Sequence, residues 1–76
     1  MELQKFIENF AAQFDETDAS EFAAGTEFKT LSEWTSLMAL SVIAMVDDEY
    51  EVAVKGNDIK TATTIEDLFE IVKSRM

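Results

Sequence analysis

The first part of the chain shows apolar and polar residues at helical spacing. Apolar residues fall on one face, at Leu3, Phe6, Ile7, Phe10, Ala11 and Phe14. Polar residues such as Lys5 and Glu8 take the other side, so the pattern predicts an amphipathic helix from Leu3 to Phe14. Aromatic residues at this spacing usually pack inside a protein, and we expect the three phenylalanines to belong to the core.

A second helix is predicted from Leu37 to about Tyr50, with Thr35 as its N-cap and Ser36 in its first turn. Its first turns are apolar on nearly all sides. Such a helix buries one side in the core, and its other apolar side is expected to contact a further surface. Met38 and Met45 fit two roles equally well, an adaptable contact surface or core filling.

The C-terminal part predicts one more long helix and one short one. Thr63 with Glu66 and Thr64 with Asp67 form overlapping capping boxes, so either threonine can start the last helix. Five residues supply its apolar face: Ile65, Leu68, Phe69, Ile71 and Val72. Upstream, we expect an extended connector with Val52 and Val54 pointing inward, a turn at Lys55-Gly56-Asn57 and a short helical turn at Asp58-Ile59-Lys60.

A long polar connection runs from Asp15 to Glu33. Loops of this length tend to be functional or to be fixed by their own apolar residues, which here are Phe22, Phe28 and Leu31. A short helical turn is expected from Ser20 to Ala24, capped by Ser20. The whole chain, residues 1–76, is therefore predicted to be one all-α domain, a small bundle of three main helices plus one short helix.

Charge and composition narrow the possible functions. The net charge of −10 repels nucleic acid and anionic membranes, and it favours partners with basic patches. The chain has no cysteine and no histidine, which removes thiolate zinc sites and the usual general base, so we expect no enzyme activity and no metal site. Asp47 to Asp58 lacks the alternating ligands and central glycine of a calcium loop. With no apolar run of membrane-spanning length and no signal-peptide pattern, we expect a soluble, cytoplasmic monomer.

The order of these elements resembles the acyl carrier protein family. The resemblance is carried by Phe28-x-x-Leu31, by Trp34-Thr35-Ser36-Leu37, by Asp47-Asp48-Glu49-Tyr50 and by Thr63-Thr64-Ile65-Glu66-Asp67-Leu68. It covers essentially the whole chain, and the family fold is a bundle of three main helices plus one short helix. In that family an Asp-Ser-Leu triplet carries 4'-phosphopantetheine on its serine, and Thr35 stands here in place of the aspartate.

The resemblance implies that Ser36 is esterified with 4'-phosphopantetheine from coenzyme A. The arm's thiol would carry acyl groups as thioesters in fatty-acid, polyketide or dedicated lipid-type biosynthesis. The implied partners are a phosphopantetheinyl transferase (holo-ACP synthase) and acyl-transferring and synthase enzymes with basic or apolar docking patches. Because this chain lacks cysteine, the arm must supply the sulfur.

Other functions stay open at this stage. Aminoacyl carriers, such as D-alanyl carrier proteins, share the same frame. Ser36 can also act only as a helix cap, which serine often does. The exchange of aspartate for Thr35 favours a further alternative, an unloaded acidic interaction module that binds a basic partner through its second helix.

Overall fold

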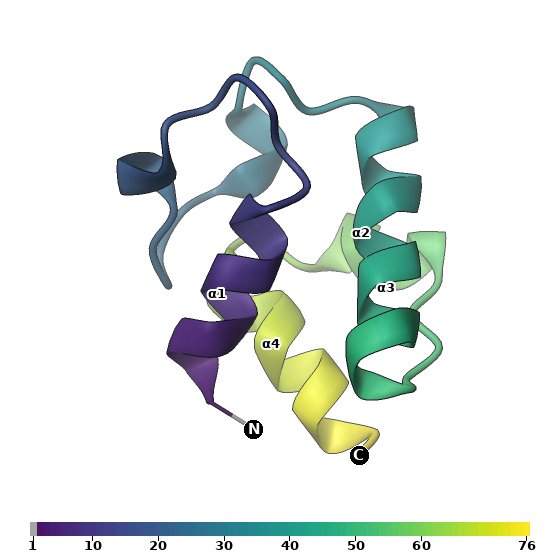
Figure 1. Ribbon diagram of the computed structural model, residues 1–76. Coiled ribbons are helices and arrows are strands. Elements are labelled where there is room, and N and C mark those ends of the chain that lie inside the picture. Colours follow the sequence, from purple (N-terminus) through teal and green to yellow (C-terminus); the bar gives the residue numbers. More distant parts are fainter. Residues whose placement is uncertain (1) are drawn as a thin grey trace.

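A computed structural model describes residues 2–76, and this part of the chain is all-helical with no strand (Figure 1). The α-helices are α1 (Leu3–Ala11), α2 (Ser36–Tyr50), α3 (Gly56–Thr61) and α4 (Ile65–Ser74). Two short 3-10 helices, η1 (Ala19–Glu21) and η2 (Phe28–Thr30), lie in the connection between α1 and α2. The predicted fold class, a bundle of three main helices and one short helix, is confirmed.

The core contains residues from all four α-helices and from the connections between them. α1 contacts α2 and α4, and α3 contacts α2 and α4. The buried side chains are all apolar: Phe6, Ile7, Phe10, Phe14, Phe22, Phe28, Val42, Met45, Val46, Val52, Val54, Ile59, Ala62, Ile65, Leu68, Phe69 and Val72. The core roles predicted for Phe6, Phe10 and Phe14 and the inward orientation of Val52 and Val54 are therefore confirmed. Met45 fills the core, whereas Met38 is only partly buried.

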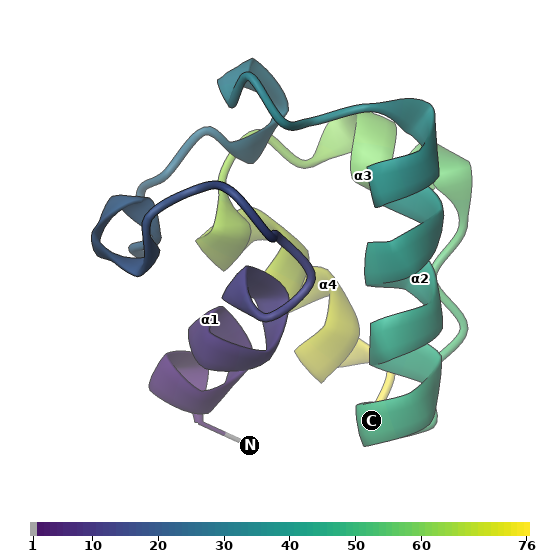
Figure 2. The same ribbon diagram turned by 45° about the horizontal axis from the view of Figure 1, so that its top comes forward.

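The long connection between α1 and α2 is held by packing against the core and by hydrogen bonds to α4. Figure 2 shows it crossing one end of the helices before α2 begins. Phe22 and Phe28 are buried in the core, and Leu31 packs against it, as predicted. The loop carbonyls of Ala24 and Thr26 accept the N–H groups of Glu66 and Ile65 at 3.0 and 3.1 Å. These bonds satisfy N–H groups in the first turn of α4, which have no partner inside the helix.

Three sequence predictions were wrong in detail. α1 ends at Ala11 and not at Phe14, because Gln13 and Phe14 donate their N–H groups three residues back in turns. The helical turn expected from Ser20 to Ala24 is η1, and its cap is Asp18, whose carboxylate accepts the N–H of Ser20 at 2.9 Å. Such local side-chain bonds compete with regular helix and move its ends.

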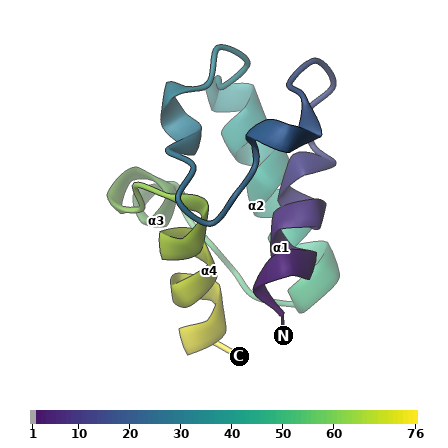
Figure 3. The same cartoon turned by 90° about the vertical axis from the view of Figure 1, so that its left-hand side faces the viewer.

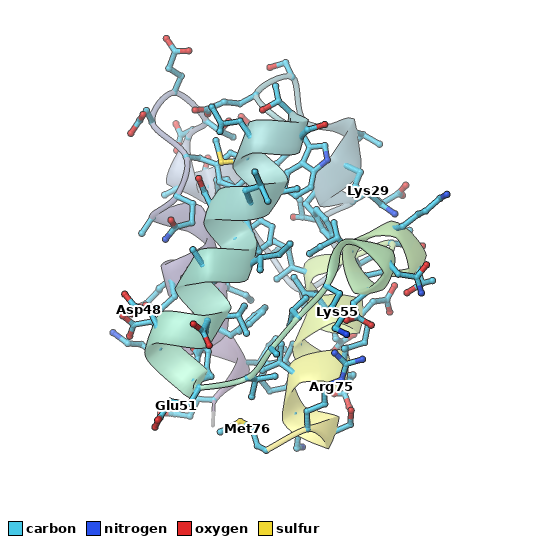
Figure 4. The ribbon with its side chains drawn as sticks, turned by 90° about the vertical axis from the view of Figure 1, so that its right-hand side faces the viewer. Lys29, Asp48, Glu51, Lys55, Arg75 and Met76 are labelled. Carbon is cyan, nitrogen blue, oxygen red and sulfur yellow. The ribbon has the colours of Figure 1, made fainter. Side chains whose placement is uncertain are left out.

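The third error concerns α3, which begins at Gly56, where a turn was expected. The Asp58 carboxylate accepts the N–H of Lys55 at 2.9 Å, and this bond completes the first turn of the helix. Arg75, at the end of α4, donates to both oxygens of Asp58 at 2.7 and 2.8 Å and to the carbonyl of Ala53 at 3.1 Å. Figure 4 shows Arg75 close to Lys55, at the start of α3. Arg75 thus ties α4 to both α3 and the connector.

Candidate functional site

Ser36 is the first residue of α2, and its side chain is exposed. The preceding residue, Thr35, is extended and caps the helix, since its hydroxyl accepts the N–H of Met38 at 3.1 Å. The predicted N-cap is confirmed, and Ser36 is not needed for that role. Within residues 2–76 no hydrogen bond holds the Ser36 hydroxyl.

The backbone around Ser36 favours a phosphate group. The N–H groups of Ser36 and Leu37 lie in the first turn of α2 and have no intrahelical acceptor. With the positive end of the helix dipole they provide donors and partial positive charge for an anion. A phosphodiester on the Ser36 oxygen would lie next to these donors, so the geometry fits the attachment chemistry that the resemblance implies.

Aromatic packing holds the chain just before Ser36. The Trp34 ring stacks on Phe14, with centroids 6.3 Å apart, and meets the Phe28 ring edge-on at 5.0 Å. Phe14 and Phe28 both contact Phe10 on α1, at 5.5 and 5.3 Å. The predicted role of Phe28 in fixing the loop is therefore visible as direct ring contacts, and Trp34 adds to them.

Sequence reasoning missed Glu33. Its Oε2 accepts the N–H of Asp15 at 2.9 Å, and its Oε1 accepts the N–H groups of Glu16 and Thr17 and the Thr17 hydroxyl at 3.1, 2.9 and 2.7 Å. The hydroxyl bond from Thr17, with the backbone donors, lowers the pKa of Glu33. No local pattern signals this arrangement, since the partners lie 16 to 18 residues earlier in the chain.

The other serines are poorer attachment points. Ser41 lies inside α2, partly buried, and its hydroxyl donates to the carbonyl of Leu37 at 3.4 Å. Ser32 lies in a turn before the helix, and Ser20 lies in η1, which is too short to provide a helix dipole. Of these residues only Ser36 combines exposure with the start of a long helix.

An exposed apolar face continues along α2 from the turn that holds Ser36. Leu37 and Leu40 are 73% and 60% exposed, and Ala44 follows on the same side of the helix. The spacing i, i+3 and i+7 places these three residues in one stripe. Asp47, Asp48 and Glu51 are exposed at the far end of α2, where Figure 4 shows Asp48 and Glu51 at the surface. The helix thus offers an apolar contact region beside an acidic one.

Two surface grooves lie away from Ser36. One, of about 370 Å³, is formed by α1 and η1 and includes Ile7 and Phe22. The other, of about 280 Å³, includes Gln13, Ser41 and Met45 along α2. Neither groove is lined by Ser36.

Within residues 2–76, no group of three or more acidic side chains is arranged to hold a metal ion. In the same part of the chain, no helix combines the length and apolarity that a membrane span requires.

Comparison with known proteins found no matching family model, curated protein or solved structure.

Proposed function

We propose that this protein is an acyl carrier protein and that Ser36 is its attachment site for 4'-phosphopantetheine. The observation that carries the proposal is an exposed, unbonded serine hydroxyl at the first position of α2, directly after a threonine that already caps the helix. The resemblance of the surrounding sequence to carrier proteins supports the same assignment.

The loading reaction is a phosphoryl transfer. The Ser36 Oγ attacks the phosphorus of coenzyme A that bears pantetheine, a new Oγ–P bond forms, and the pyrophosphate bond breaks. Adenosine 3',5'-bisphosphate leaves, and the serine proton passes to a base of the transferase. The chain supplies the nucleophile and its presentation, while the base is supplied by the transferase, since this chain has no histidine.

The exposed face formed by Leu37, Leu40 and Ala44 supports a specific mode of recognition. It lies next to Ser36, so an enzyme that reaches the serine must approach this face. An apolar patch on the partner would cover the two leucines, and basic residues beside that patch would face Asp47 and Asp48. The transferase and the acyl-transferring enzymes are proposed to share this surface.

Intact mass tests the proposal. The purified chain is incubated with coenzyme A and a broad-specificity phosphopantetheinyl transferase, and we expect the mass to rise by one phosphopantetheinyl group. Because the chain has no cysteine, a maleimide should then label one thiol, and only after loading. Ser36→Ala should abolish both signals, and the matched control Ser41→Ala should preserve them. An unchanged wild-type mass, or loading that persists in Ser36→Ala, would refute the assignment.

The same experiment separates the second candidate, an unloaded acidic module. This alternative is favoured by Thr35, which provides a cap but not the carboxylate that precedes the serine in the family. If the mass does not change with any of several transferases, while a basic partner still binds α2, the module is the better interpretation. If the chain is loaded instead, analysing the species bound to the thiol identifies the load as acyl or aminoacyl.

A further inference from the structure

Glu33 joins two segments at the end of the bundle where Ser36 lies. Its two carboxylate oxygens accept four hydrogen bonds from Asp15, Glu16 and Thr17, the residues that follow α1. Figure 3 shows the loop after α1 and the loop before α2 at the same end of the molecule. A single side chain therefore fixes the position of one loop against the other.

The ring contact made by the next residue also joins these two segments. Trp34 follows Glu33 in the chain and stacks on Phe14, which precedes Asp15. Two consecutive residues of one segment thus bind consecutive residues of the other, one through polar bonds and one through ring packing. Thr35 comes next and is fixed by its bond to the N–H of Met38. The backbone leading to Ser36 is restrained at each of these positions.

We propose that Glu33 is a positioning residue that holds the first turn of α2, and with it the Ser36 hydroxyl, in the geometry needed for transfer. This inference rests on the proposed function of Ser36. Loss of the carboxylate would release residues 15–17 from the segment that precedes Ser36. The first turn of α2 would then open more often, and the hydroxyl would spend less time in a reactive position.

A role of Glu33 as a substitute for the missing aspartate does not fit its geometry. Its Oε1 accepts three hydrogen bonds and its Oε2 accepts one, so the carboxylate already binds residues 15–17 of this chain. The hydrogen bonds from Thr17 and the backbone favour the charged form and lower its pKa. We therefore assign Glu33 an effect on Ser36 that is transmitted through the connecting backbone.

Loading kinetics give the first test. With the transferase and coenzyme A, we expect Glu33→Ala to lower kcat about 10- to 100-fold, as for misplaced reacting groups, with KM for the carrier unchanged because the exposed face of α2 is intact. Glu33→Gln keeps one oxygen that can accept some of these hydrogen bonds, so its kcat should lie between those of wild type and Glu33→Ala. The control is Glu27→Ala, an exposed glutamate of the same connection whose side chain makes no cap bond.

Amide hydrogen exchange gives a test that does not need loading. In Glu33→Ala the amides of Met38 and Ala39 should exchange about 10-fold faster, while Val72 in the last turn of α4 keeps its wild-type rate. If Glu33→Ala does not fold, Glu33→Gln is measured in its place.

The outcomes are distinguishable. A wild type that is not loaded refutes the proposed function, and the exchange rates alone then decide whether Glu33 holds the first turn. A wild type that loads, with an unchanged kcat in Glu33→Ala, overturns the positioning role. Equal acceleration of exchange in α2 and α4 also overturns it, because it would show a general loss of stability.

Discussion

Replacing Asp58 by asparagine removes the charge that Arg75 binds while it keeps a side chain of the same shape. Arg75 contacts both oxygens of Asp58, and these side chains are 41% and 16% exposed. The Arg75 hydrogen bond, followed by the bond from the N–H of Lys55, lowers the Asp58 pKa from 3.8 to about 2. At about 1.4 kcal/mol for each pKa unit, this corresponds to an upper limit of about 2.5 kcal/mol at neutral pH. Solvent screening of this partly exposed pair reduces the expected loss to about 1 kcal/mol.

The sign of the pH dependence follows from the lowered pKa. The contribution of Asp58 is fully present above the unfolded-state pKa of 3.8, and it is lost as the pH falls through about 2. Urea denaturation followed by circular dichroism should therefore show wild type more stable than Asp58→Asn at about pH 7. The difference should shrink below about pH 4 and vanish below about pH 2.

The matched control is Asp47→Asn, which removes the same charge from an exposed position of α2. It should not lower the stability at neutral pH, because a negative charge near a helix C-terminus is unfavourable. If wild type and Asp58→Asn lose stability in parallel from neutral to acid pH, the carboxylate does not provide the interaction with Arg75 and the reasoning fails.

Two further substitutions address α2. Thr35→Asp keeps an N-cap and adds a negative charge at the start of α2, which should stabilise the helix by about 0.3–1 kcal/mol. Because aspartate precedes the serine in carrier proteins, we also expect faster loading of Ser36. Slower loading in the mass assay would contradict this. Glu51 ends α2 with left-handed backbone angles, φ 54° and ψ 39°, which cost a non-glycine residue about 1 kcal/mol. Glu51→Gly should raise the unfolding free energy by about that amount, whereas Ala44→Gly, within the helix, should lower it by about 1 kcal/mol; a stability loss in Glu51→Gly would refute the strain argument.

Local patterns were sufficient for much of the fold. The apolar spacing around Phe6 and Phe10 predicted α1, because burial of one face dominates the stability of a short helix. Thr35 marked the start of α2, and Thr63 and Thr64 marked the start of α4 to within one residue, because a side-chain oxygen can satisfy orphan N–H groups within three residues; the structure selects Thr64 as the cap. Both signals act over one or two turns, and a sequence window contains all the atoms involved.

Helix ends and ties between loops depended on partners far away in the chain. α1 stops before Phe14, and the next residues give their N–H groups to Glu33, which nothing in the residues around Asp15 predicts. The start of α3 depends on Asp58, and its carboxylate is also bound by Arg75 from the end of α4. These hydrogen bonds form only after the core has brought the segments together.

The sequence by itself determined that the chain is helical, where its long helices start to within one residue, and which serine follows the cap of the apolar helix. Those features follow from side-chain spacing and capping, which are properties of neighbouring residues. The tertiary structure alone decided that Glu33 and Trp34 hold the approach to Ser36 against residues 14–17. The physical reason is that a carboxylate or an aromatic ring has many possible partners in the extended chain, and only the packed core selects among them.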